Sequence, residues 1–143
     1  MRRMVLVTVA VSALAIGGCS SVQRLELSVL PEPSVEKGLV YFFREKAFQG
    51  SAVTLSVYDG DDKIGVLQNG TFFFIEAGPG LHTYSAKTEV SDRIHVAVEA
   101  GKCCFVKAST RLGLFVGQPE LSLVNEAEGK AIVEELDYAV WKR

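Results

Sequence analysis

Few residues of this chain carry side chains that could do chemistry: its 143 residues include three cysteines and two histidines. A hydrolase needs a nucleophile, a base and an orienting group that converge in space. His82 and His95 stand outside the Gly-x-Ser-x-Gly and His-Glu-x-x-His patterns that mark such sites. A metal site needs three or four ligands, and no spacing of His and Cys supplies them. We therefore predict structural roles for both histidines, and no catalytic residue, metal or cofactor.

One cysteine, Cys19, ends a segment that has the three parts of a secretory signal. Two arginines stand near the start of the chain, residues 4–16 carry no charge, and two glycines precede the cysteine. The uncharged run is shorter than the roughly 20 residues that a membrane-spanning helix needs. We predict a signal peptide over residues 1–18 that is cleaved between Gly18 and Cys19.

The sequence Leu-Ala-Ile-Gly-Gly-Cys over residues 14–19 resembles the lipobox of bacterial lipoproteins. By this resemblance Cys19 becomes the mature N-terminus and its thiol accepts diacylglycerol. Two or more palmitate-type acyl chains anchor a protein stably, whereas a single chain does not. Ser20 stands where an Asp would resemble an inner-membrane retention signal, so we expect the bacterial outer membrane, with the protein facing the periplasm. Residues 19–36 contain two prolines and no sustained periodicity, which predicts a lipidated tether.

The other two cysteines, Cys103 and Cys104, are adjacent in a protein that we expect to meet oxidising conditions. Neighbouring residues of a strand point to opposite faces, so a disulfide between them would distort the peptide. The pair also lacks the two-residue spacer of a thioredoxin-like motif. We expect one thiol in the core and one on the other face, with a thiol redox protein as an alternative.

The stretch Asp-Gly-Asp-Asp at residues 59–62 resembles part of a calcium loop, but Gly70 stands where the loop needs its twelfth-position Glu. A hairpin turn explains this stretch fully. The overall charge is balanced, with 17 acidic and 15 basic side chains. No Lys/Arg stripe occurs, which excludes an electrostatic case for nucleic-acid binding. The length and the 48% apolar content predict one globular domain.

The body of the chain, residues 37–143, has apolar residues that alternate or form short runs between turn residues. That spacing is typical of a sandwich or barrel. Residues 38–44 are apolar on both faces, which favours a central strand. Residues 93–99 alternate, and we expect them to form a hairpin with residues 103–109. We predict an all-β fold, a small antiparallel β-sandwich of seven or eight strands.

A helical stripe follows the last strand and extends from Ala127 to Val140, which predicts one C-terminal helix with Asn125 as its N-cap. Gly129 weakens this helix by about 1 kcal/mol relative to alanine. Before it, a glycine-containing loop over residues 112–118 includes Leu114 and Phe115. These two residues are a candidate contact patch, and packing against the helix is the alternative.

Six sequence blocks follow one another in a fixed order, at residues 38–44, 64–65, 69–73, 79–83, 100–106 and 123–129. The first reads Gly-Leu-Val-Tyr-Phe-Phe-Arg, the third Asn-Gly-Thr-Phe-Phe and the fourth Pro-Gly-Leu-His-Thr. Together with the lipobox, this order resembles the bacterial lipoprotein family named domain of unknown function 2846, over about residues 37–136. The resemblance implies a transthyretin-like or PEGA-type β-sandwich, with no catalytic residues to carry over.

These observations predict a lipid-anchored envelope lipoprotein that acts as a non-enzymatic binding or structural module. Its expected partners are the membrane, through the N-terminal lipid, and an envelope protein or polymer. One alternative is an envelope enzyme whose site forms only in the folded chain, with His82, His95, Asp92 and residues 59–62 as candidates. The other is a thiol redox protein that uses Cys103 and Cys104.

Overall fold

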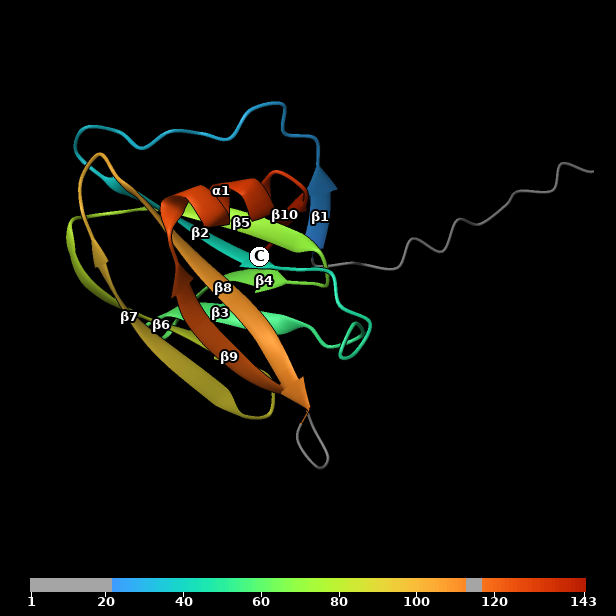
Figure 1. Ribbon diagram of the computed structural model, residues 1–143. Coiled ribbons are helices and arrows are strands. Elements are labelled where there is room, and N and C mark those ends of the chain that lie inside the picture. Colours follow the sequence, from blue (N-terminus) through green and yellow to red (C-terminus); the bar gives the residue numbers. More distant parts are fainter. Residues whose placement is uncertain (1–21, 113–116) are drawn as a thin grey trace, which may run out of the picture.

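The computed structural model describes residues 22–112 and 117–143, which form two β-sheets packed face to face and one helix (Figure 1). Sheet A has the strand order β1-β10-β5-β2-β8-β9, and sheet B has the order β4-β3-β6-β7. The predicted all-β sandwich with a helix near the C-terminus is confirmed, with ten strands in the described residues in place of seven or eight. The elements are β1 (Val22–Leu25), β2 (Gly38–Arg44), β3 (Leu55–Asp59), β4 (Asp62–Leu67), β5 (Thr71–Ala77), β6 (Gly80–Lys87), β7 (Ser91–Val98), β8 (Cys103–Leu112), β9 (Gly117–Val124), α1 (Glu126–Val133) and β10 (Asp137–Trp141).

Strand β2 lies inside sheet A and is buried along its whole length, as its apolar sequence predicts. Val40 and Phe42 belong to the core between the two sheets. Phe42 stacks on Phe73 of β5 at a centroid distance of 5.1 Å and meets the edge of Tyr84 of sheet B at 4.9 Å. These aromatic contacts join the sheets across the inner core.

Sheet B buries one face and exposes the other. In β7, Val96 and Val98 are buried against sheet A, whereas Arg93 and His95 are exposed, so the predicted alternation is confirmed. The turn predicted at residues 59–62 joins β3 and β4 into a hairpin, and Gly60 adopts there a φ of +57°. The outer face of sheet B is therefore a solvated polar surface.

The pairing within sheet A differs from the expected antiparallel pattern, because β2 pairs with β8 in parallel and β10 pairs with β5 in parallel. The hairpin expected between residues 93–99 and 103–109 is wrong, since β7 lies in sheet B and β8 in sheet A. Gly101, with a φ of +76°, lies in the turn that carries the chain from one sheet to the other. Strand β8 has apolar residues on both faces: Val106 and Ala108 belong to the core against sheet B, and Phe105 belongs to the outer cluster that α1 covers.

Two strands occur where the sequence indicates other structure. Strand β1 lies inside the segment expected as a tether, and it pairs with β10 from Val22 opposite Trp141 to Leu25 opposite Tyr138. The helix expected to reach Val140 ends at Val133, and residues 137–141 form β10. The residues of β10 include Tyr, Val and Trp, which favour strands, and pairing with both β1 and β5 overrides the helical stripe.

Helix α1 packs across the outer face of sheet A (Figure 1). Asn125 caps it as predicted, because its side-chain oxygen accepts a hydrogen bond from the Glu128 backbone N–H at 2.9 Å. Gly129 is buried against β8, and a Cβ at this position would lie 2.3 Å from Cγ of Phe105. The glycine therefore permits a close approach of helix and sheet that a larger residue would block. Among the described residues, no helix has the length and apolar character needed to span a membrane.

Candidate functional site

A groove with a volume of about 800 Å³ runs between α1 and the segment that joins β1 to β2. We call residues 26–33 of that segment the strap. The strap arches past α1 on the same side of sheet A (Figure 1). The volume of the groove falls in the range of roughly 300–1,000 Å³ that small-molecule and cofactor sites occupy.

The floor of the groove is an aromatic layer on the outer face of sheet A. Tyr41 of β2 stacks on Phe105 of β8 at a centroid distance of 4.9 Å and contacts Phe72 of β5 at 6.3 Å. All three side chains are at most 2% exposed. The floor is therefore closed, and a bound molecule would touch mainly the strap and α1.

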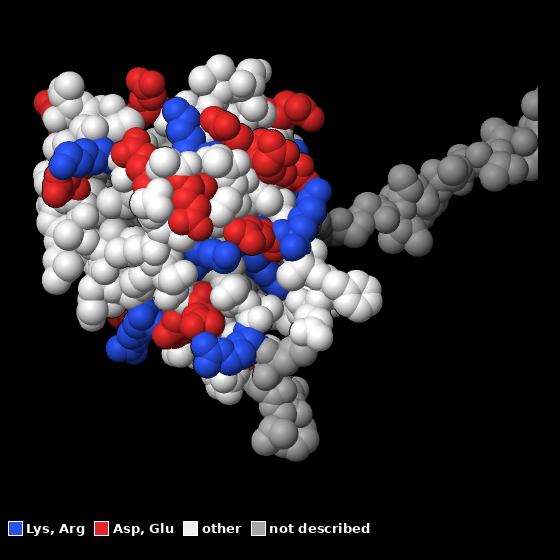
Figure 2. Space-filling view, in the orientation of Figure 1, with Lys and Arg blue, Asp and Glu red and all other residues white. Residues whose placement is uncertain are grey.

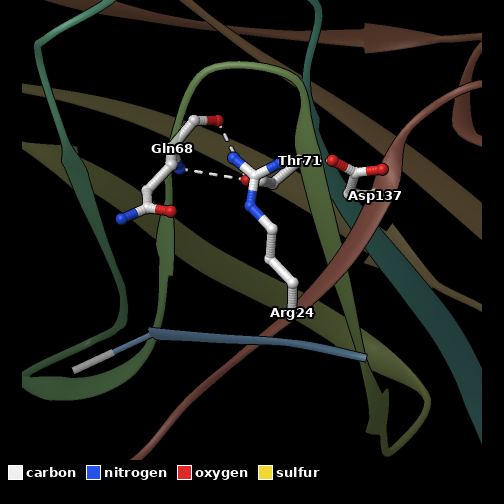
Figure 3. Close-up of polar contacts among 4 residues, drawn as sticks. All are labelled: Arg24, Gln68, Thr71 and Asp137. Atoms are coloured by element: carbon white, nitrogen blue, oxygen red, sulfur yellow. Dashed lines mark hydrogen bonds and ion pairs between the residues drawn. The ribbon is translucent and has the colours of Figure 1, made fainter. Parts of the chain in front are cut away.

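Both ends of the strap are fixed to the sheet. Near its C-terminal end, the Tyr41 hydroxyl donates a hydrogen bond to the Pro31 carbonyl at 2.6 Å, and burial raises the pKa of Tyr41 well above its usual value. On the N-terminal side of the strap, Arg24 of β1 forms an ion pair with Asp137 at the start of β10. Figure 3 shows the Arg24 side chain reaching toward Asp137 and the turn at residues 68–71. The Asp137 backbone N–H donates to the Gly70 carbonyl of that turn at 3.1 Å.

The walls of the groove are acidic. Within the described part of the chain, four exposed wall carboxylates form no ion pair with a lysine or arginine; they are Glu26 and Glu32 on the strap and Glu126 and Glu134 near the two ends of α1. The lysines of the groove are Lys102, which pairs with Glu99, and Lys130. Acidic side chains gather on the face that carries α1 (Figure 2). The groove therefore favours a positively charged occupant.

Cys103 lines this groove, whereas Cys104 packs against the core between the sheets, so the expected placement of the two thiols on opposite faces is confirmed. Both are free thiols. Burial raises the pKa of Cys103, and the nearby carboxylate of Glu126 raises it further. Burial also raises the pKa of Cys104, whose sulfur lies 3.8 Å from the Ala97 carbonyl. Raised pKa values favour the protonated, unreactive thiol.

Of the polar residues considered for an enzyme site, His82 and Asp59 meet, whereas His95 and Asp92 lie apart from them. His82 lies on the inner side of β6, with Nε2 at 2.8 Å from the Gly78 carbonyl oxygen and Nδ1 at 3.6 Å from an Asp59 carboxylate oxygen. His95 is exposed on the other face of sheet B, where its Nδ1 lies 3.0 Å from the Thr83 hydroxyl. Neither histidine lines the groove.

Asp92, the remaining enzyme candidate, has a structural contact. Its carboxylate accepts a hydrogen bond from the Leu121 backbone N–H at 2.7 Å and so links β7 of sheet B to β9 of sheet A. In residues 22–112 and 117–143, no three His, Cys, Asp or Glu side chains are grouped closely enough to hold a metal ion.

Four residues named from the sequence lie outside the described residues: Gly18 and Cys19 of the cleavage and lipidation site, and Leu114 and Phe115 of the contact patch. Sequence reasoning missed the groove because the prolines and serines of the strap are typical of a linker. One signal was present, since Leu25, Leu27 and Val29 alternate with polar residues as in a strand.

Comparison with known proteins identifies the family. A family model described as "Protein of unknown function (DUF2846)" matches residues 34–118. An uncharacterized protein of Haemophilus influenzae is 34% identical over 110 residues, which are 75% of this chain and 65% of that protein. The chain thus spans about 65% of the length of this relative. No solved structure matches this chain. Because the family match covers more than half of the 143 residues, the chain belongs to the DUF2846 family, as its ordered sequence blocks predict.

Proposed function

We propose that this protein is an outer-membrane lipoprotein, anchored by lipid on Cys19, that holds a basic segment of another envelope protein in the groove between the strap and α1. The anchor rests on the lipobox-like sequence at residues 14–19. The observation that carries the binding role is the groove itself, whose two walls present carboxylates that form no ion pair with a lysine or arginine of the described residues.

The chemistry of the walls defines the partner. Carboxylates on both sides of one groove attract cationic side chains and set their register. The strap and the residue before it add apolar contacts, because Leu25, Leu27 and Val29 are 42%, 37% and 79% exposed. A segment with alternating basic and apolar residues would use both features. The groove thus suits a peptide better than a small uncharged molecule.

A binding role without catalysis fits the arrangement of the reactive side chains. The two histidines lie on opposite faces of sheet B, and neither belongs to the groove. Cys103 does belong to it, but burial and Glu126 raise the pKa of its thiol. A redox role would need the thiolate form at neutral pH.

The anchor is tested by mass spectrometry of the N-terminal tryptic peptide, residues 19–24, from separated inner and outer membranes. We expect an acylated peptide in the outer-membrane fraction. An unmodified N-terminus in a soluble fraction would reject the anchor.

The groove is tested by titrating a fluorescent lysine-rich peptide into the mature protein and following anisotropy. Replacing Glu126 and Glu134 by glutamine should weaken binding by about tenfold, because each lost charge contact contributes up to roughly 1 kcal/mol. The matched control replaces Asp61 and Glu89, which are exposed and outside the groove, by their amides. This control removes the same net charge and should leave binding nearly unchanged. Equal losses in both variants would show attraction by net charge alone and would reject the groove.

A further inference from the structure

We propose that the domain lies directly on the bilayer, with the end of sheet A at which β1 begins facing the lipid headgroups. The inference rests on the proposed anchor at Cys19 and deepens it by naming the surface that meets the membrane. It follows from where the folded domain starts, from the reach of the chain before that point, and from the residues at that end.

Val22, the first residue that the structure describes, already belongs to the folded domain. This residue is 7% exposed and packs with Val66 of β4 and Ala139 of β10. Its strand pairs with β10 over four residues, and the ion pair between Arg24 and Asp137 adds a side-chain link. The fourth to seventh residues of the segment expected from its composition to be a tether therefore belong to the sheet.

The chain between the lipid and the domain is short. Ser20 and Ser21 are the residues between Cys19 and Val22. Three residue steps span at most about 10 Å even when fully extended. The headgroup layer of one leaflet takes up roughly 5–8 Å, since a bilayer is about 40–45 Å thick with a hydrocarbon core of about 30 Å. An acylated Cys19 at the base of that layer leaves Val22 at the surface of the headgroups.

The end of the sheet beside Val22 carries residues that suit this position. Trp141 is the cross-strand partner of Val22, and it is half-buried with the Lys63 ammonium 4.8 Å from its ring centroid. Lys142 and Arg143 follow directly and are exposed. Tryptophan is enriched at membrane interfaces, and basic side chains near the surface are attracted by anionic lipids.

This placement also sets the height of the groove. The strap begins after Leu25, three residues along β1 from Val22, which is about 10 Å at the rise of a strand. The groove is then held close to the bilayer, and the partner segment that we propose for it would be one that runs near the membrane surface.

The experiment uses the single tryptophan of the chain as its probe. The full mature protein, acylated in cells, is reconstituted into phosphatidylethanolamine and phosphatidylglycerol vesicles that contain a headgroup-spin-labelled lipid. Mass spectrometry of the same sample reports whether Cys19 carries its lipid. We expect the spin label to quench most of the Trp141 fluorescence.

Two variants serve as controls. Inserting 20 Gly and Ser residues between Ser21 and Val22 keeps the lipid but frees the domain, and it should abolish most of the quenching. Combining Trp141→Phe with Val90→Trp moves the probe to the turn between β6 and β7, beside the Gly117 end of β9. This probe should be quenched far less than Trp141.

The outcomes separate the two proposals. Weak quenching of Trp141, or equal quenching of both probes, in protein whose Cys19 is acylated would overturn the docked orientation and leave the lipoprotein assignment standing. A sample with unmodified Cys19 would reject the anchor, and the orientation would fall with it.

Discussion

The two faces of sheet A are covered in different ways. The inner face packs against the four strands of sheet B, and its core consists of apolar side chains in continuous contact. The outer face is covered by an eight-residue helix and a strap without secondary structure. A whole sheet packs on the inner face, whereas these two narrow elements leave a groove of about 800 Å³ on the outer one.

Two tyrosines show the same contrast. Tyr84 on the inner side is fully buried, and its hydroxyl has no hydrogen-bond partner in the described residues. Tyr41 on the outer side is also buried, but its hydroxyl holds the strap through the Pro31 carbonyl. The inner face thus gains stability from apolar packing, and the outer face uses a polar contact to position a wall of the groove.

The largest effect is expected from the inner face. Replacing Phe42, which contacts both Phe73 and Tyr84, by alanine should lower the free energy of unfolding by about 3–5 kcal/mol. The comparison is Phe74→Ala, because Phe74 is half-buried on the outer face. Urea unfolding of both variants measures the difference, and a cost for Phe74→Ala as large as that for Phe42→Ala would contradict the contrast between the faces.

A smaller effect is expected where α1 meets the sheet. Gly129→Ala should destabilise the protein by about 1–3 kcal/mol, because the new Cβ would collide with Phe105, and this outweighs the helix propensity that alanine gains. Gly78→Ala is the matched control, since a Cβ there meets nothing within 4 Å. We expect the control to change stability by less than about 0.5 kcal/mol. A stabilised Gly129→Ala variant in thermal unfolding would mean that the helix lies farther from β8.

Replacement by phenylalanine should affect the free energy of unfolding differently at the two tyrosines. Tyr41→Phe removes the hydrogen bond to Pro31 and should cost about 1 kcal/mol. Tyr84→Phe removes a buried hydroxyl that has no partner among the described residues, and it should be neutral or stabilising. Parallel denaturant titrations measure both, and equal costs would show that the Tyr84 hydroxyl is also engaged.

The mildest effect is expected from pH near neutrality. Burial raises the pKa of Tyr41, Tyr84, Cys103 and Cys104 in the folded protein above the usual values of 10.0 for tyrosine and 9.0 for cysteine. These groups therefore contribute stability that is fully present below the unfolded pKa values and is lost as the pH rises through the folded ones. The titration of these four groups should change the melting temperature little between pH 7 and 8 and should lower it above about pH 9. A melting temperature that rises between pH 9 and 11 would contradict these shifts.

The parts of the fold that the sequence predicts are those that local pattern determines. Strand β2 is apolar on both faces, residues 93–99 alternate, and Asn125 stands where a helix cap belongs. Each of these features depends on a few neighbouring residues. Their burial and hydrogen bonding in the folded chain agree with the pattern.

The parts that the sequence does not reveal depend on distant partners. Residues 137–141 become a strand because β1, at the other end of the described chain, pairs with them. Arg44 is charged, yet it is 2% exposed, and its guanidinium donates to the Val53 and Gly50 carbonyls of the following loop. The groove depends on the strap, whose linker-like composition conceals the contact between Tyr41 and Pro31.

A basic segment held between the strap and α1 would lie on the incompletely covered face of sheet A. Hydrogen–deuterium exchange of the mature protein, with and without the lysine-rich peptide, locates the bound peptide. We expect the peptide to slow exchange in the strap and α1 and to leave the strands of sheet B unchanged. Slower exchange in the strands of sheet B, with the strap and α1 unaffected, would contradict this location.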